Sequence, residues 1–265
     1  MSDRYIAVLM ACHNRAKTTV RCLQLLMEAT STWQNGNDAG STRKLRVFLV
    51  DDGSTDGTEE EVGRLFDDSM VQIIKGNGEL FWAKGMELAW RTAIDVESSG
   101  SRFTHFLWLN DDAMLNPNAV ESLFSKDDGR SLVVGDLCDA TGRSVYGLNV
   151  NGWVNGNCVL VPRRIYECIG MICGDYCHAW ADSDYALRVM RAGFDIVSTG
   201  IVGVAEWHPL RPPLAGKSLG ERWLLLFDPK GWNLHDLWLY RRRNWGWARA
   251  VLSCVHFTVK VLIGR

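Results

Sequence analysis

The chain has 265 residues, of which 47% are hydrophobic and 23% are charged, so it is long and apolar enough to bury a sizeable core. Its formal net charge of −2 excludes a generic nucleic-acid-binding protein, because such a protein needs a basic surface to contact backbone phosphates. The sequence lacks a signal-peptide pattern at its start and an uncharged run of transmembrane length, and its eight cysteines lack zinc-like spacing. We therefore expect a cytoplasmic enzyme with free thiols.

The first half of the sequence alternates apolar runs with segments of helical periodicity, which is typical of successive βαβ units. These patterns predict strands at 5–12, 46–50, 71–75 and up to residue 110, and helices at 15–30, 56–66 and 81–97. A polar stretch at 31–43 is interpreted as a surface loop, and shorter strands are expected at 132–137 and 159–161. The alternation predicts an α/β fold with a doubly wound, mainly parallel sheet that is covered on both faces.

An apolar strand that ends in an amide and two carboxylates is the first candidate site. Asn110, Asp111 and Asp112 follow it directly, so they would project into the crevice beyond the carboxyl end of the sheet, where open α/β sheets bind ligands. Carboxylates suit Mg²⁺ or Mn²⁺, which complete their shells with phosphate and water, so the segment predicts a metal site that takes a phosphate ester. The alternative is a turn whose aspartates cap the next helix.

A second strand runs into carboxylates at Asp51 and Asp52, followed by the small turn residues of 53–58. A carboxylate at this strand end can accept the imide N–H of uracil or thymine, and the adjacent glycine allows a sharp turn. This pattern predicts recognition of a nucleobase. A second role, in which Ser54 or Asp56 caps the following helix, is compatible with it.

Three segments together resemble a known family. They are Ala-Cys-His-Asn-Arg at 11–15, Val-Asp-Asp-Gly-Ser-Thr-Asp at 50–56 and Leu-Asn-Asp-Asp at 109–112, and they resemble family 2 of the inverting glycosyltransferases over residues 4–210. The resemblance implies the GT-A fold, a Rossmann-like doubly wound sheet that binds a nucleotide-sugar with a divalent cation. The asparagine at position 110, where many relatives have aspartate, is similar to a rhamnosyltransferase-like subgroup.

The resemblance also implies roles for residues on the donor side. Asp52, with Asp51 beside it, falls where the family contacts the nucleobase, and Asp112 matches the carboxylate that holds Mg²⁺ or Mn²⁺ on the diphosphate. The other expected donor contacts are Asn14, Gly76, Asn77, Lys84, Gly85, Asn110 and Asp111, with Lys84 placed to reach a phosphate. For residues 75–85 the alternative is a flexible loop whose aromatic side chains pack inward.

Asp182 is the candidate general base, because the family carries at this position the aspartate that deprotonates the acceptor hydroxyl. A carboxylate in a partly closed cleft can have its pKa raised toward the working pH, which suits that role. Ala181 replaces the acid that usually precedes it. The alternative is structural: Asp182 caps the following helix, and Asp184 pairs with Arg188 one turn later.

The remaining site expectations concern a histidine and the acceptor side. His208 is expected near the metal or the diphosphate, since an imidazole can contact either. Trp153, Asn155 and Trp180 are candidates to line a sugar subsite, although large aromatic side chains are equally typical of a core.

Two regions are expected, a glycosyltransferase domain over 1–210 and a helical, basic and aromatic extension over 211–265. Within the first, residues 1–112 would bind the nucleotide-sugar and residues 113–210 the acceptor. The extension combines arginines with tryptophans and an apolar stretch at 251–263, which suits peripheral contact with the inner face of a membrane and is too short to span it. The alternative is a closing helix packed on the domain.

Together these expectations describe metal-dependent, inverting transfer of a sugar from a UDP- or dTDP-linked donor to a saccharide or lipid-linked saccharide, in bacterial surface polysaccharide synthesis. Two alternatives stay open. One is a catalytically impaired module that binds nucleotide-sugar or carbohydrate. The other is a sugar-1-phosphate nucleotidyltransferase, which would need a glycine-rich basic loop after the first strand, unlike residues 12–16.

Overall fold

The computed structural model describes residues 3–36, 42–97, 102–148, 153–205 and 211–264. The strands are β1 Arg4–Cys12, β2 Arg43–Asp51, β3 Val71–Lys75, β4 His105–Leu109, β5 Met114–Leu115, β6 Ser131–Cys138, β7 Ser144–Tyr146, β8 Cys158–Pro162 and β9 Asp195–Val204. The helices are α1 Ala16–Asn35, α2 Thr58–Leu65, α3 Phe81–Val96, α4 Ala119–Ser125, α5 Arg163–Ile169, α6 Ala181–Arg191, α7 Leu219–Leu225, α8 Leu234–Trp245 and α9 Trp247–Ile263.

The strands form one sheet in the order β3-β2-β1-β4-β8-β6-β9-β5, with β7 paired to β6. β3, β2, β1 and β4 are parallel neighbours, as the alternation of strands and helices predicted. Beyond β4 the strand β8 runs antiparallel, and β6 pairs antiparallel with β8 and parallel with β9. The expected Rossmann-like α/β sheet is therefore confirmed, with a mixed extension in the second half of the chain.

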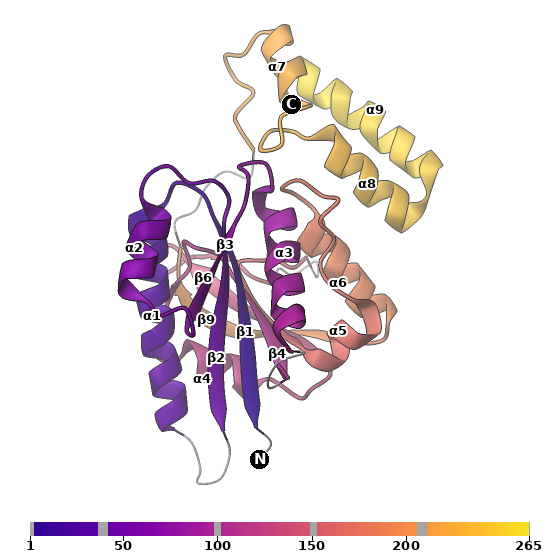
Figure 1. Cartoon of the computed structure of the whole chain (residues 1–265). Helices are drawn as coiled ribbons and strands as arrows, with labels where there is room; N and C mark the ends of the chain where they lie inside the picture. The colour runs from indigo at the N-terminus through magenta and orange to yellow at the C-terminus, as the bar shows by residue number, and fades with distance from the viewer. Residues whose placement is uncertain (1–2, 37–41, 98–101, 149–152, 206–210, 265) are drawn as a thin grey trace.

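Helices cover both faces of the sheet, and each face has its own core (Figure 1). One core packs α1, α2 and α4 against residues such as Val8, and the other packs α3, α5 and α6 against residues such as Leu9. Every side chain of β1 from Ile6 to Met10 is buried. Successive strand residues point to opposite faces, so a strand covered on both sides needs this continuous apolar sequence.

The expectation of a loop throughout 31–43 is wrong, because α1 continues to Asn35. Trp33 lies in the last turn of α1, is 1% exposed and stacks on Phe124 of α4 with ring centroids 4.9 Å apart. Burial of this large side chain holds the polar end of the helix against its neighbour. The length of α1 is therefore set by packing that the local polar composition conceals.

The C-terminal helices α7, α8 and α9 stand at the end of the molecule where β1 and β2 finish (Figure 1). A small core that includes Leu214, Leu226 and Val261 holds them together, while Tyr240 of α8 belongs to the core of the main body. No helix in the described part of the chain is long and apolar enough to cross a membrane. The extension thus packs on the domain through α8.

Candidate active site

The carboxyl ends of β1 and β2 lie side by side, because Cys12 pairs with Asp51 in parallel register. The loops that follow them are joined through Asn14. Its backbone N–H donates to Ser54 Oγ at 2.9 Å, and its Oδ1 accepts the backbone N–H of Thr55 at 2.7 Å. Asn14 has a φ of 51°, a conformation that asparagine adopts more readily than most residues. This residue therefore fixes the relative position of two loops on the expected donor side.

Asp52 is 5% exposed, and its carboxylate accepts hydrogen bonds from backbone N–H groups of the same chain. Oδ1 accepts the backbone N–H of Gly78 at 2.8 Å, and Oδ2 accepts those of Leu80 and Phe81 at 3.0 and 2.9 Å. Phe81, the first residue of α3, has a φ of 53°, which a phenylalanine rarely adopts. Asp52 therefore holds the loop between β3 and α3 in its unusual conformation.

Asp51 accepts fewer hydrogen bonds from described residues than its neighbour Asp52 does. It is 7% exposed, and its Oδ1 accepts the backbone N–H of Ser54 at 3.0 Å. Within the described part of the chain no hydrogen bond engages its Oδ2. If this pair recognises a nucleobase, Asp51 is the residue with an oxygen left to accept an imide N–H.

The two glycines expected on the donor side are required for close packing. A Cβ on Gly76 would lie 2.6 Å from Asp52 Oδ1, and a Cβ on Gly85 would lie 2.9 Å from Ala11 Cβ in β1. Gly76 therefore lets the loop pass over Asp52, and Gly85 lets α3 approach the sheet. Asn77 is exposed in the same loop, where its Oδ1 accepts the next but one backbone N–H at 3.0 Å.

Asp111 and Asp112 converge on one guanidinium. Arg15 Nη1 lies 3.1 Å from Asp111 Oδ1 and 2.9 Å from Asp112 Oδ2. Asp111 is 5% exposed, and burial raises its pKa to about 6, although the charge of Arg15 opposes this shift. Asp112 Oδ1 is buried and has no hydrogen-bond partner among the described residues.

This pair of carboxylates fits a divalent cation. A buried oxygen without a partner is unfavourable unless a ligand reaches it, and the unpartnered Asp112 Oδ1 is of the hard type that Mg²⁺ and Mn²⁺ prefer. Arg15 brings one positive charge to two carboxylates, so the cluster keeps a negative charge that attracts a cation. His208, the other expected ligand, lies outside the described residues.

Asn110 connects the donor side to the segment before β8. Its Oδ1 accepts the indole N–H of Trp82 at 2.8 Å, and its Nδ2 donates to Asn157 Oδ1 at 2.6 Å. Its backbone N–H also donates to the backbone oxygen of Asn157 at 2.9 Å. Because the side chain both accepts and donates, an amide suits this position, and the departure from aspartate has a structural explanation.

Asp182 lies at the other end of this connection, as the second residue of α6. Its Oδ2 accepts the backbone N–H of Gly156 at 3.1 Å, and its Oδ1 accepts that of Ser183 at 2.7 Å. Burial raises the pKa of Asp182 above the ordinary value for aspartate, although these two hydrogen bonds oppose the shift. A carboxyl group with a raised pKa suits a general base.

The expected acceptor residues are close to one another and to α8. Trp180 has a φ of 72° and stacks on Tyr240 of α8 with centroids 4.7 Å apart, and its ring lies 5.8 Å from that of Trp153. Trp153 is 38% exposed. Asn155 turns back on its own segment, where its Oδ1 accepts the backbone N–H of Asn157 at 3.2 Å. The two tryptophans therefore present aromatic surface beside α6.

Asp236 is a residue that the sequence reasoning missed. It lies in the first turn of α8, is fully buried, and its carboxylate accepts the backbone N–H groups of Cys177, His178 and Ala179 at 3.0, 3.0 and 3.1 Å. These residues lead directly to Trp180 and α6. The sequence did contain one indication of its importance: Asp236 is the single acidic residue among residues 229–265, and the other charged residues of this segment are all basic.

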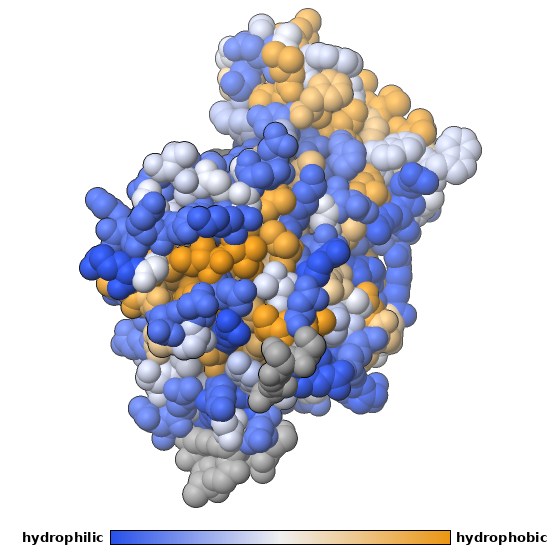
Figure 2. Space-filling model, in the orientation of Figure 1, coloured by the Kyte–Doolittle hydropathy of each residue, from blue (hydrophilic) through white to orange (hydrophobic). Residues whose placement is uncertain are grey.

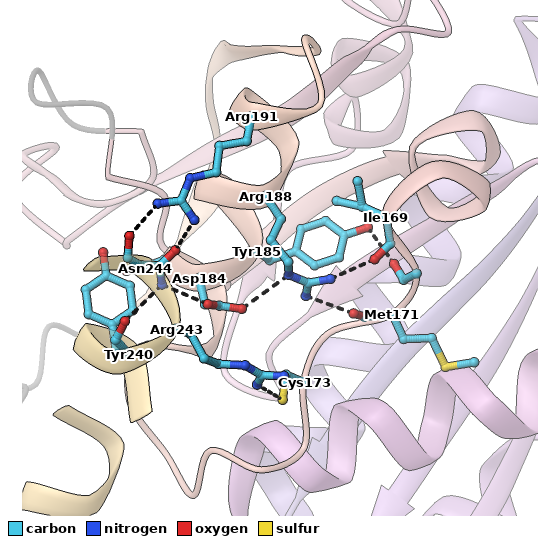
Figure 3. A network of polar contacts seen from close by, with 12 residues as sticks. Ile169, Met171, Cys173, Asp184, Tyr185, Arg188, Arg191, Tyr240, Arg243 and Asn244 are labelled. Atoms are coloured by element: carbon cyan, nitrogen blue, oxygen red, sulfur yellow. Dashed lines mark hydrogen bonds and ion pairs between the residues drawn. The ribbon is translucent and has the colours of Figure 1, made fainter. Parts of the chain in front are cut away.

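A second set of contacts fixes α8 to α6, and Figure 3 shows Asn244 between Asp184 and Arg191. Asn244 Nδ2 donates to Asp184 Oδ1 at 2.9 Å, and Arg191 donates to the backbone oxygen of Asn244 at 2.9 Å. Asp184 also pairs with Arg188 at 3.2 Å, as its helical spacing predicted. The helix that carries Asp182 is therefore held by the C-terminal extension, and a domain boundary at residue 210 stays a prediction.

A cleft of about 540 Å³ lies between α3 and α8, and its lining includes Lys84, Cys177 and His235. Lys84 is exposed there in the first turn of α3. Ligand atoms of Cys177, His235 and Asp236 lie within 4.8 Å of one another. They make a poor metal site, because the Asp236 carboxylate already accepts backbone N–H groups.

With this geometry in view, residues 7–170 match the family model described as Glycosyl transferase family 2. The chain belongs to this family. The match includes the donor-side residues from Asn14 to Asp112 and ends before Trp180 and Asp182. The match therefore does not test the expected role of Asp182 in this family 2 glycosyltransferase, which stays a prediction.

Solved structures share the GT-A fold with this family 2 chain at low sequence identity. The mannosyltransferase PcManGT from Pyrobaculum calidifontis, in complex with GDP-Man and Mn²⁺, has a TM-score of 0.55 and 15% identity over 98% of this chain and 68% of that chain. TarS 1–349 from S. aureus, in complex with UDP-GlcNAc, has a TM-score of 0.59 and 11% identity over 98% of this chain and 82% of that chain. At such identities the likeness shows the fold alone. The comparison with curated proteins gave no match.

Proposed function

We propose that this family 2 glycosyltransferase uses Mg²⁺ or Mn²⁺ to transfer a sugar, with inversion, from a UDP- or dTDP-linked donor to a saccharide or lipid-linked saccharide. The observation that carries the proposal is the short path between its two acidic sites. Asn110, adjacent to Asp111, is hydrogen-bonded to Asn157, and the preceding residue Gly156 donates to Asp182. The metal-type carboxylates and a carboxyl group suited to proton transfer thus lie at the two ends of one hydrogen-bonded connection.

Donor recognition would be divided between Asp51 and the residues around it. Asp51 has an oxygen available for the imide N–H of a pyrimidine, while Asp52 positions the loop that carries Gly76 and Asn77. The TarS structure is a complex with UDP-GlcNAc, a uridine donor, and the PcManGT structure is a complex with GDP-Man. Both bases carry an N–H beside a carbonyl, so a carboxylate acceptor is compatible with either.

The diphosphate would be bound next to Asp112. Asp112, with Asp111 beside it, would hold a divalent cation, which when bound supplies positive charge for the leaving nucleoside diphosphate. The PcManGT structure contains Mn²⁺, which supports this choice of ions. Arg15, close to both carboxylates, would offset part of their mutual repulsion before the cation binds.

Proton transfer falls to Asp182. As the acceptor hydroxyl attacks the anomeric carbon from the side opposite the diphosphate, Asp182 takes its proton, and this single displacement inverts the configuration. Its raised pKa makes it a stronger base than an ordinary aspartate. Trp153 would hold the acceptor sugar beside it, and Trp180, whose own ring stacks on Tyr240, would support Trp153 from 5.8 Å away.

Hydrolysis and transfer assays with a panel of UDP-, dTDP-, GDP- and ADP-sugars, with and without Mn²⁺, test the proposal. We expect cation-dependent release of a nucleoside diphosphate and, with an acceptor, a product of inverted anomeric configuration by NMR. Asp112→Asn should abolish transfer and weaken the cation-dependent binding of the donor, because an amide keeps the shape and loses the charge. Retained configuration would contradict the mechanism.

The two alternative functions predict different results in the same assays. Nucleotide-sugar binding by calorimetry without hydrolysis or transfer would indicate the impaired module, for which Ala181 and Asn110 are the arguments. Condensation of a nucleoside triphosphate with a sugar-1-phosphate would indicate the nucleotidyltransferase. The rhamnosyltransferase-like donor, the role in bacterial surface polysaccharide synthesis, and a location on the inner face of the membrane are finer parts of our proposal, and the donor panel addresses the first.

A further inference from the structure

Helix α9 leaves a row of large apolar side chains in solvent. Trp247, Val251, Val255, Val259 and Ile263 recur every four residues, so each lies next to the following one, in a ridge that winds gradually around the exposed part of the helix. Their exposed fractions run from 40% to 71%. The packing of α9 uses other positions, and we call this row the α9 stripe.

Helix α7 adds to the exposed apolar surface. Leu219 and Trp223, again four residues apart, are 67% and 50% exposed, and Phe227 just beyond the helix is 60% exposed. Arg222 of α7 donates to the backbone oxygen of Leu262 at 2.9 Å, which ties this helix to α9. Figure 2 shows the apolar side chains gathered over these C-terminal helices, at the top right of the view.

Single exposed apolar side chains are ordinary, but two rows on helices that contact each other are not. Contiguous exposed apolar surface on a soluble protein marks an interaction site. The inward side of α9 is filled by residues such as Ala250 and Val261, both fully buried. The stripe is therefore additional to the packing of the extension and needs a partner of its own.

The charges around the stripe select the kind of partner. The described extension, residues 211–264, contains nine basic residues: Arg211, Lys217, Arg222, Lys230, Arg241, Arg242, Arg243, Arg249 and Lys260. It contains three acidic residues: Glu221 and Asp228 are exposed, whereas Asp236 is fully buried and bound to backbone N–H groups. The solvent-facing charge here is positive, and basic residues beside an apolar helix face are the pattern of helices that lie on anionic membranes.

We propose that α7 and α9 dock this protein on an anionic phospholipid bilayer, with α9 lying in the plane of the interface. No helix among the described residues is long and apolar enough to span the bilayer, so the contact is peripheral. One further consequence rests on the proposed function: docking would bring a lipid-linked acceptor close to Trp153 and Trp180. Trp180 stacks on Tyr240 of α8, the helix that directly precedes α9.

A second copy of the chain is the rival occupant of the stripe. Two copies meeting through this surface would bring Arg249 and Lys260 of each chain toward those of the other, and like charges repel. An anionic bilayer instead gains from the same residues. The charge pattern therefore favours lipid over self-association.

Vesicle flotation of the full chain tests the proposal. We expect binding to phosphatidylcholine vesicles that contain phosphatidylglycerol, weaker binding to phosphatidylcholine alone, and loss of the difference at high salt. The double variant Leu252→Glu with Val255→Glu should reduce binding at least about tenfold, because it places charge in the interface. Val255 belongs to the α9 stripe, and Leu252, three residues before it, is its exposed neighbour on the helix surface. Both positions are exposed, at 70% and 58%, so the fold should survive.

The matched control is Leu65→Glu with Met190→Glu, two apolar positions that are 40% and 45% exposed on other helices and should leave vesicle binding unchanged. The proposal is overturned if both double variants lose vesicle binding equally, or if the parent chain does not bind vesicles. Self-association would also overturn it: light scattering would detect a dimer that Val255→Glu separates into monomers, and the parent chain would not bind vesicles. Donor hydrolysis without lipid is measured in parallel: its failure with intact vesicle binding refutes the proposed function alone, and the reverse result refutes the docking surface alone.

Discussion

The guanidinium of Arg15 lies 2.9 Å from the carboxylate of Asp112, at the place where we propose a divalent cation. It also lies 3.1 Å from Asp111, whose burial already raises its pKa to about 6. The two carboxylates thus interact with the guanidinium of Arg15 and are also the proposed ligands of Mg²⁺ or Mn²⁺. Arg15 uses Asp112 Oδ2, and the free Oδ1 of the same carboxylate is left for the cation, so two positive groups held by one pair of carboxylates repel each other.

Replacement of Arg15 by Met should strengthen binding of Mn²⁺ to the nucleotide-free protein, by about tenfold, because it removes the repelling charge. It should also lower the free energy of unfolding by about 1 to 2 kcal/mol, since the buried Asp111 loses its charge partner. Calorimetric titration with Mn²⁺ and urea unfolding measure the two effects. Arg15→Lys keeps the charge and serves as the control. Weaker Mn²⁺ binding in Arg15→Met would show instead that Arg15 organises the site for the cation.

The two neighbouring carboxylates after β2 should separate into a recognition residue and a structural residue. We expect Asp51→Asn to weaken binding of UDP by about tenfold or more while the fold stays intact, because a charged acceptor for the imide N–H is lost. Asp52→Asn should mainly lower stability, since it weakens the bonds to Gly78, Leu80 and Phe81. Calorimetry and thermal unfolding distinguish the two. Equal affinity for UDP and ADP in the parent protein would refute base recognition by this pair.

The sequence predicted those parts of the fold whose signal is local. The apolar run of β3 ends where predicted, at Lys75, and the strands of the first half are parallel as their alternation with helices implied. The end of α1 was missed because Trp33 packs on Phe124, and this contact is invisible in the polar composition of residues 31–35. Helix length here depends on tertiary burial rather than on propensity.

In the candidate site, too, the sequence predicted what depends on local signals and missed what depends on tertiary contacts. Strand ends place Asp51, Asp52, Asp111 and Asp112 at one edge of the sheet, which topology alone predicts. What the sequence could not give is how each carboxylate is used, because Asp52 is engaged by a loop that follows a different strand. Asp236 contacts a segment 57 to 59 residues earlier in the chain, and no local pattern connects the two.

Asp236 should act as a positioning residue for the segment before α6. Asp236→Asn should lower the free energy of unfolding by about 2 kcal/mol or more, because a charged acceptor of several backbone N–H groups is lost in a buried place. Among variants that still fold, we expect the KM for the acceptor to rise more than the KM for the donor, since the segment leads to Trp180. Asp175→Asn, at a side chain that is 71% exposed, is the matched control. A uniform loss of kcat with both KM values unchanged would contradict this role.

The pH dependence of Asp182 distinguishes a base from a helix cap. Its folded pKa is raised, so between the unfolded and folded values the native state binds more protons than the unfolded state. The free energy of unfolding should therefore fall as pH rises through that window, and Asp182→Asn should lack this contribution. The transfer rate should rise with pH through the folded pKa, because only the ionised carboxylate can take the acceptor proton.

If Asp182 is the base, Asp182→Asn should reduce transfer by at least about a hundredfold and leave donor affinity nearly unchanged. The reason is geometric: its hydrogen bonds run to Gly156 and Ser183, and none of its described contacts involves Asp111 or Asp112. Asp184→Asn is the control, because it breaks the contacts to Arg188 and Asn244 and should lower stability while it keeps the acid limb of the pH profile. Near-normal turnover in Asp182→Asn would reduce this residue to a structural role and make Asp184 or Asp175 the candidate base. A collapse of donor binding would instead assign Asp182 to the metal site, since only a group in contact with the cation or the diphosphate changes donor affinity to that extent.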